Sequence, residues 1–423
     1  MATRNRVIYQ SEAVYCTQDV VFSGGQGSAY ANKDLNRVQS ANYSFDISRT
    51  DVNQFGQLGA IDRIITESPS VSFDSSYLLA NFANEKRLGF FVTNSGTAGP
   101  FRSCITDIID STSNAYQKNF YILQAKEGKD ADVETTGTTA SSGQWESIIG
   151  IGNAGLTSYS VEAAVGGFPT VSFAAEGLNM NFNTVTKVSD SGNAHPYYIS
   201  GINPAINPVN GAAYNDGQLG TCDVALPAPT GNAGGTTAAQ KAAGDVSVLR
   251  PGDLRLFLSK QTDDSVATAA TTTSMVSPDY AGADIADAHI QSFNIGFDLS
   301  RSSIEQLGNK FAYARLIDFP VTVSMGIDAV VSDLTTGSLA DIINCDDKFD
   351  ARIQLGSPEP CGASATNSAP AANYILKGIK LDSQSFSLGI GDNKSVSLSF
   401  SSQIGGPEQS GMGLFMSGYT GIL

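Results

Sequence analysis

Few residues in this chain have the types and spacing that acid–base or metal chemistry needs. Asp46 and Asp298 could be proposed as the two carboxylates of a hydrolytic site. The two histidines, His195 and His289, stand in unrelated contexts and in no metal-ligand spacing. The acidic run Asp346-Asp347-Lys348-Phe349-Asp350 lacks the glycine and the terminal glutamate of an EF-hand loop, so we interpret it as a solvated group of charges.

Other sequence signatures of catalysis are missing as well. The chain has no phosphate-binding loop, nucleophile elbow, zinc-protease motif or dinucleotide-binding glycine motif. Its five cysteines are scattered and form no CxxC pair, which favours reduced thiols in a chain folded in the cytosol. Spacing leaves open whether Cys345 and Cys361 form a bridge after release from the cell. We therefore expect no catalytic residues, no cofactor and no metal, and we predict that the protein is not an enzyme.

Asp46 and Asp298 occupy equivalent positions in an internal repeat. The segment Val38–Gly56, VQSANYSFDISRTDVNQFG, aligns with Ile290–Gly308, IQSFNIGFDLSRSSIEQLG, at a shift of 252, and nine of the nineteen positions are identical. A second block, 156–177, aligns with 381–402 at a shift of 225. Because repeats determine the fold assignment, this duplication takes precedence over single motifs. The equivalence of the two aspartates argues for a shared structural face and against a catalytic pair.

The repeated segments have the period-two alternation of β-strands with one buried face. In the first copy, Ala41, Tyr43, Phe45 and Ile47 alternate with polar residues. Each copy offers four such strands, and the last two form a hairpin in each copy. Their polar face is small, polar or acidic, with Lys394 at a turn as the one basic residue we assign to it. A plain sheet that faces water is the alternative. The candidate residues of this face are Ser44, Asp46, Asp74, Glu162, Ser172, Glu176, Asp298, Ser324, Asp328, Ser387, Ser397 and Ser399.

A chain of 423 residues exceeds one ordinary core, and the repeat supplies two domains. We predict a mainly β protein with two tandem β-sandwich or barrel domains, each with a short flanking helix at 78–88 or 334–343, and with loop-rich insertions. The predicted boundaries are an N-terminal arm at 1–35, the first copy at 36–185 with an insertion at about 95–150, an inter-repeat insertion at 186–287 that could be a small decoration domain, the second copy at 288–410 with an insertion at about 333–370, and a C-terminal tail at 411–423.

The charge balance restricts the partners of the chain. It holds 25 basic and 41 acidic residues, a net charge of −16, and such a chain does not grip phosphate backbones. The first residues, MATRNRVIYQ, lack the apolar segment of a signal peptide, and no apolar run approaches the roughly 20 residues that cross a bilayer. We expect a product that is made and first folds in the cytoplasm, and we expect no membrane partner.

Three segments of the repeat resemble the tail tube proteins, or major tail proteins, of long-tailed bacteriophages: QSANYSFDISRTDVNQFG, VSFDSSYLLANFANEKRLGF and ILKGIKLDSQSFSLGIGDNKSVSLSFSSQIGG. The resemblance implies a β-sandwich flanked by a helix, with inner sheets that join between subunits into a barrel. It implies rings of six such domains, stacked head-to-tail in the tail of the virion beside other tail proteins. Double-stranded DNA would pass through the channel without specific binding, and the polar-face residues above would line it.

This chain departs from a single-domain tube protein because it holds two copies and a long middle segment. If six domains close a ring, two per chain predict a homotrimeric ring with pseudo-sixfold symmetry. One alternative is a carbohydrate-binding β-sandwich module or adhesin on a virion or cell surface, with Tyr197 and Tyr198 as the candidate aromatic residues. A capsid shell protein is a further alternative.

Overall fold

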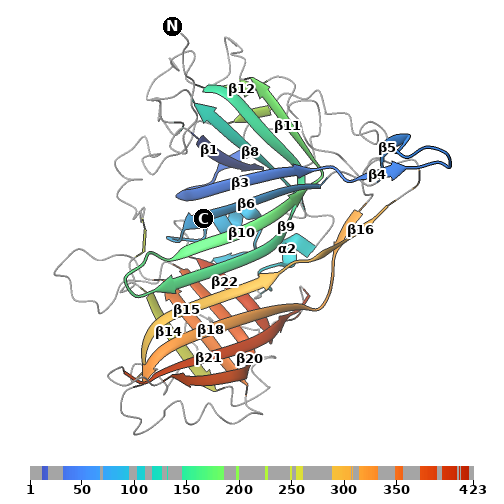
Figure 1. Ribbon diagram of the computed structural model, residues 1–423. Helices are drawn as coiled ribbons and strands as arrows, with labels where there is room; N and C mark the ends of the chain where they lie inside the picture. Colours follow the sequence, from blue (N-terminus) through green and yellow to red (C-terminus); the bar gives the residue numbers. More distant parts are fainter. Residues whose placement is uncertain are drawn as a thin grey trace.

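The computed structural model is mainly β, as the sequence predicts, and its described residues form strands β1 to β22 and two short helices (Figure 1). The structure describes residues 12–17, 32–66, 70–94, 102–109, 117–125, 131, 145–184, 197–199, 224–226, 248–249, 254–260, 288–305, 307, 314–331, 348–355, 372–387, 393–406, 409 and 411–418. The predicted helix at 334–343, His195, Cys222, Cys345 and Cys361 lie outside them.

One continuous antiparallel sheet of eight strands, here called the inner sheet, contains the repeated strands of both copies. Its order is β3-β6-β10-β9-β15-β18-β21-β20, and Figure 1 shows these strands following one another down the molecule. Unit 1 contributes β3 (Val38–Asp46), β6 (Ser70–Leu78), β9 (Trp145–Ala164) and β10 (Thr170–Gly177). Unit 2 contributes β15 (Ala288–Asp298), β18 (Val321–Val331), β20 (Ala372–Ser387) and β21 (Ser395–Ile404). Equivalent strands thus follow the same order in both units.

Further strands belong to sheets that continue from the long strands β9 and β20 and bury the apolar side of the inner sheet. In unit 1 these are β1 (Glu12–Thr17), β2 (Asn32–Asp34), β8 (Lys118–Ala125) and β11 (Asn179–Thr184), attached to the first part of β9. In unit 2 they are β14 (Leu254–Lys260), β19 (Phe349–Leu355), β22 (Gly413–Gly418) and β7 (Val92–Asn94), attached to the first part of β20. Apolar residues of both units form one buried cluster.

The strands β9 and β20 each pass from the outer layer into the inner sheet, and each bends at a residue with positive φ. These residues are Asn153 (φ 52°) in β9 and Gly378 (φ 61°) in β20, which the repeat makes equivalent at the shift of 225. The left-handed conformation favours Gly and tolerates Asn, and both types occur here. A side chain fixes the bend in each unit, because Asn119 Oδ1 accepts from Asn153 N at 3.0 Å and Asp350 Oδ1 accepts from Gly378 N at 2.9 Å.

Several segments that the sequence suggests are insertions or tails hold core strands. β8 lies within the predicted insertion at 95–150, β19 within 333–370, and β22 within the predicted tail at 411–423. β14 lies within 186–287 yet pairs with β19 of unit 2, and β1 and β2 of the predicted arm pair within unit 1. Of these strands, β8, β19 and β22 are buried on both sides or nearly so, and a strand buried along its length lacks the period-two signal that reveals half-buried strands.

The predicted helix at 78–88 is shorter than expected: α1 is Ala83–Leu88, while Leu78 ends β6. It stops at Gly89, whose φ of 103° suits a left-handed C-cap. The second helix, α2 (Thr106–Ile109), is a single turn. In the described part of the chain, no helix has the length and apolar character needed to cross a membrane.

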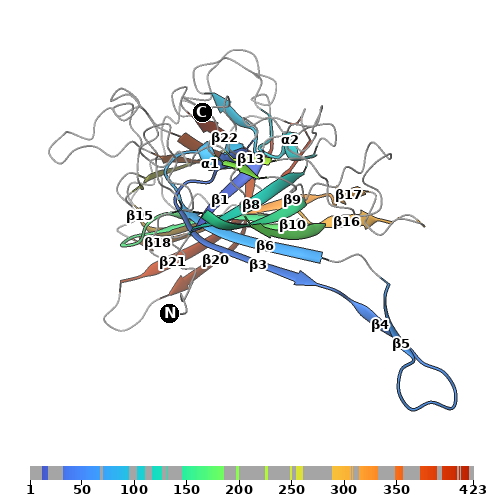
Figure 2. The same ribbon diagram turned by 90° about the horizontal axis from the view of Figure 1, so that it is seen from above.

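Two hairpins continue from the first strand of each unit. In unit 1, β4 (Arg49–Val52) and β5 (Asp62–Ile65) project away from the body of the molecule (Figure 2). In unit 2, the equivalent β16 (Arg301–Ile304) and β17 (Ala314–Ile317) lie against unit 1. A small separate pair joins β12 (Tyr197–Ile199) and β13 (Val224–Leu226).

Candidate functional site

The candidate site is the polar face of the inner sheet, where the structure places all twelve predicted residues. Cross-strand partners share a face, and the pairing runs through both units without a break. One row joins seven small residues in succession: Ser40, Ser76, Ser172, Ser160, Gly296, Ser324 and Ser401. The twelve residues are exposed or, at Glu176 and Ser399, half-buried.

This arrangement rules out a catalytic pairing of Asp46 and Asp298. Asp46 lies opposite Ser70 beside the sheet edge, whereas Asp298 lies opposite Ser158 in the middle of the sheet. Four inter-strand steps separate β3 from β15. At about 4.8 Å a step, the two strands are roughly 19 Å apart, and the carboxylates are farther apart still, because the row of Asp298 reaches β3 at Asn42 and not at Asp46. Glycosidase carboxylates stand about 5–9.5 Å apart.

The polar face is acidic, with one basic residue that the sequence interpretation left out. Lys380 is exposed and lies opposite Ser401, so it shares this face at the point where β20 enters the inner sheet. The expectation that Lys394 is its one basic residue is therefore wrong. The bulge between Leu381 and Ser383 conceals the assignment, because it breaks the simple alternation along β20. Lys394 instead lies over the ring of Phe386, at 4.6 Å, on the other side of the sheet. The six acidic positions therefore outnumber Lys380.

Hydrogen bonds between neighbouring strands occupy many groups of this face. Asp328 accepts from Ser292 Oγ at 2.7 Å and from Ser397 Oγ at 2.6 Å, one on each flanking strand. Asn294 Oδ1 accepts from Gly326 N at 2.7 Å, and a Cβ at position 326 would lie 2.5 Å from that oxygen. The hydroxyl and carboxylate groups thus brace the sheet. Among the described residues, no group of three or more His, Cys, Asp or Glu side chains could hold a metal ion.

The polar face is hollowed near the junction of the two units. A concave region of about 480 Å³ is lined by residues of β9, β15, β18, β20 and β21, among them Glu162, Asn294 and Asp328. Its other contacts are mostly serines and glycines. The hollow presents oxygen atoms and small side chains and offers no cationic anchor for an anionic ligand.

The inner sheet ends in two open edges, β3 and β20. Apolar positions there are uncovered, while their repeat equivalents are buried at the β9–β15 junction. Phe45 in β3 is 41% exposed and its equivalent Phe297 is 4% exposed. Phe386 in β20 is 51% exposed and its equivalent Val161 is fully buried. The predicted buried face of β3 is therefore only half covered, because no strand lies beside it among the described residues.

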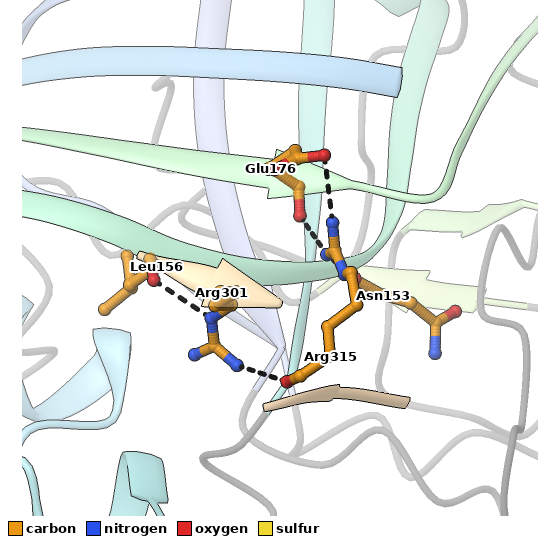
Figure 3. Close-up of polar contacts among 5 residues, drawn as sticks. All are labelled: Asn153, Leu156, Glu176, Arg301 and Arg315. Atoms are coloured by element: carbon orange, nitrogen blue, oxygen red, sulfur yellow. Dashed lines mark hydrogen bonds and ion pairs between the residues drawn. The ribbon is translucent and has the colours of Figure 1, made fainter. Parts of the chain in front are cut away.

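A second contact between the units depends on two arginines to which the sequence interpretation gave no role (Figure 3). Arg301 Nε donates to the carbonyl of Leu156 at 3.2 Å, and Arg315 Nη2 donates to the carbonyls of Asn153 at 3.1 Å and of Glu176. Arg315 Nη1 also lies 3.3 Å from Glu176 Oε1. The signal was present in the repeat, because Arg301 and Arg315 are identical to Arg49 and Arg63.

A buried carboxylic acid lies where the units meet. Glu85 of α1 accepts from Tyr77 Oη at 2.7 Å and Tyr159 Oη at 3.1 Å, and Tyr159 is 2.8 Å from Tyr374 of unit 2. Burial raises the pKa of Glu85 from 4.5 to about 7, although the tyrosine hydrogen bonds act in the opposite direction. Cys16 and Cys104 are buried and form no disulfide, and burial raises the pKa of both thiols, that of Cys16 to about 11, which disfavours the nucleophilic thiolate.

No protein-family model and no curated protein matches this chain. The side chains of Tyr197 and Tyr198, the candidate residues of the carbohydrate-binding alternative, lie outside the described part of the structure.

Proposed function

We propose that this protein is a structural, non-enzymatic component of a bacteriophage tail tube, in which copies of the chain close into rings around a channel for DNA. The main support is the β9–β15 junction. It joins the last inner strand of one unit to the first inner strand of the next, head to tail, and leaves the equivalent strands β20 and β3 open. A heterologous contact of this kind closes into a ring if its rotation permits.

Applying the same junction between chains gives a specific register for β20 and β3. The pair Ser160–Gly296 becomes Ser385–Ser44, the pair Ser158–Asp298 becomes Ser383–Asp46, and Val161–Ile295 becomes Phe386–Tyr43. The last pairing would cover the exposed Phe386. Three chains of eight inner strands would form a barrel of about 24 strands, which is wide enough for an open channel. Closure would also remove both exposed sheet edges.

The composition of the polar face supports a channel through which DNA slides. Serine, glycine and carboxylate groups make up most of the face, and its six acidic residues, which outnumber Lys380, repel phosphates. The row of seven small residues runs across seven of the eight inner strands and ends at Lys380 of β20, so most of the wall would be smooth. Rings would stack through segments outside the inner sheet. This second head-to-tail contact would propagate into a tube, which we place in the tail of the virion.

A disulfide across the open edges tests this function. Val165 N donates to Gln291 O and Leu299 N to Thr157 O, so the Ser160–Gly296 pair between them is a non-hydrogen-bonded pair. The transferred pair Ser44–Ser385 should have the same short spacing, which suits a disulfide. We expect the Ser44→Cys/Ser385→Cys chain to form covalent oligomers on oxidation, in a ladder that stops at the closed ring.

The matched control is Ser44→Cys/Ser324→Cys, because Ser324 lies on the same face between two paired strands and has no open edge. This variant should remain monomeric under the same oxidation. Negative-stain microscopy of the parent chain should show hollow rings or stacked tubes. Discrete solid particles, together with equal cross-linking of both variants, would overturn the proposal and favour a surface-binding module.

A further inference from the structure

The β16–β17 hairpin of unit 2 shows how such a hairpin attaches to a neighbouring unit. It continues from β15, which pairs with β9, and its arginines then bind backbone carbonyls at the bend of β9 and at the end of β10 (Figure 3). The Arg315 side chain is only 3% exposed there. Leu299, just before the hairpin, and Ile317 at its end are also buried. The contact thus combines guanidinium hydrogen bonds with apolar burial.

The equivalent β4–β5 hairpin of unit 1 carries the same residue types without a neighbour. Arg63, the counterpart of Arg315, has a side chain that is 68% exposed and rests on Asp51 of its own hairpin at 2.6 Å. Ile65 is 39% exposed, whereas its counterpart Ile317 is 8% exposed. The exposure does not differ at every position of the two hairpins: Ile64 and its counterpart Leu316 are both 48% exposed. The difference is therefore confined to the side of the hairpin that touches unit 1 in the docked case.

The surface that receives the docked hairpin in unit 1 has a counterpart in unit 2. The acceptor carbonyls of Asn153 and Glu176 correspond to those of Gly378 and Ser401, and both bends have positive φ. The carbonyl of Gly378 has a long contact of 3.4 Å from Ser402 Oγ, and a carbonyl oxygen can accept twice. Asp350 takes the place of Asn119 behind this bend, which adds a carboxylate near the arriving guanidinium.

One difference between the two receiving surfaces concerns Arg49. Its counterpart Arg301 packs so closely on Gly155 that a Cβ there would lie 2.7 Å from Arg301 Nε, and unit 2 has Lys380 at this position. Arg49 therefore cannot repeat the pose of Arg301. Arg63 can repeat the two carbonyl hydrogen bonds of Arg315, because the Lys380 side chain does not replace those acceptors. It cannot repeat the contact of Arg315 with Glu176 Oε1, because Ser401 stands at that position in unit 2.

We propose that the β4–β5 hairpin docks on unit 2 of a second copy of this chain, where Arg63 leaves Asp51 and donates to the carbonyls of Gly378 and Ser401. This inference rests on the proposed ring, because the β3–β20 pairing brings the hairpin to that surface. The contact extends the inter-chain interface beyond the strand edges. It also fixes the angle between successive units, since the hairpin and the strand pair bind at two separate places.

Thiol labelling of the full-length chain tests the docking. The variants Ile65→Cys and Ile64→Cys are each combined with the Ser44→Cys/Ser385→Cys pair, and labelling is measured before and after cross-linking, with the parent chain as the reference for native thiols. We expect about fivefold slower labelling at position 65 after cross-linking, in proportion to the lower exposure of Ile317. Position 64 should label at an unchanged rate.

The outcomes separate the two proposals. If the cross-link forms and position 65, like position 64, labels at the same rate before and after cross-linking, the ring stands and the docking is refuted. If the cross-link does not form, both proposals fall. Adding Arg63→Ala should restore fast labelling at position 65 in cross-linked rings, whereas Lys86→Ala, an exposed basic residue on α1, should leave the protection intact. Protection that survives Arg63→Ala would refute the assigned role of the guanidinium.

Discussion

The first and second units carry equivalent strands in the same order, yet they bury the outermost ones to different extents. Phe297 of β15 packs against Tyr159, with ring centroids 5.6 Å apart, while its counterpart Phe45 on β3 is 41% exposed. The residue type is the same at both positions, so the difference comes from the neighbour and not from the local sequence. Edge strands that keep apolar residues are normally a liability, and here they have the composition of a strand that is buried when paired.

The largest expected effect on stability comes from replacing Phe297 by alanine, with the same replacement of Phe45 as the comparison. Phe297→Ala should lower the free energy of unfolding by about 3–5 kcal/mol, because it leaves a cavity in the packed junction. Phe45→Ala should cost the isolated chain about 1 kcal/mol and should act mainly on assembly. Urea denaturation of the unassembled chains measures both values. Equal destabilisation by the two variants would mean that β3 is already covered in the isolated chain.

The buried Glu85 gives the junction a pH dependence. Its pKa is 4.5 in the unfolded chain and about 7 in the folded one, so between these values the folded state keeps a proton that the unfolded state has released. The contribution of Glu85 to stability should therefore decrease by about 3 kcal/mol as the pH rises from about 4.5 through 7. Glu85→Gln should abolish this decrease in denaturation curves recorded across that range. Glu162→Gln, an exposed control, should leave it unchanged.

Replacing the equivalent residues Arg315 and Arg63 should have intermediate effects on stability that differ between the two units. Arg315→Ala should destabilise the chain by about 2 kcal/mol, because it leaves the buried carbonyls of Asn153 and Glu176 without this donor. Arg63→Ala should change stability by less than about 0.5 kcal/mol, since its ion pair with Asp51 is largely exposed and screened by solvent. Thermal denaturation of both variants at one pH measures the two losses of stability and checks that the loss is larger for Arg315→Ala. A similar loss for Arg63→Ala would contradict a free hairpin in the unassembled chain.

The smallest effect on stability is expected on the polar face. Asp46→Lys and Asp298→Lys should each change the free energy of unfolding by less than about 0.5 kcal/mol, because both side chains are exposed. If the face lines a channel, tubes with both changes should retain double-stranded DNA at low salt and slow its passage. Tubes of the double variant that pass DNA at the parent rate would refute the electrostatic explanation.

Much of the inner sheet could be predicted from the sequence because half-buried strands alternate. The repeat located β3, β15 and the hairpins, and the polar residues of all eight inner strands fall on one face. The strands β8, β19 and β22 could not be predicted in this way, because they are buried along their length and show no alternation. Lys380 was missed for a related reason, since the bulge beside it shifts the phase of β20.

From the amino-acid sequence alone one can see that two segments repeat, which residues the repeats share, and that the polar residues of their strands are small or acidic. Those properties are local, set by side-chain type and by a period of two residues. The folded chain is needed to see that the units join edge to edge through β9 and β15, and that Arg315 is buried while Arg63 is exposed. Identical residues acquire different surroundings there, because pairing between distant strands depends on which edge a neighbour occupies, and no local pattern encodes that.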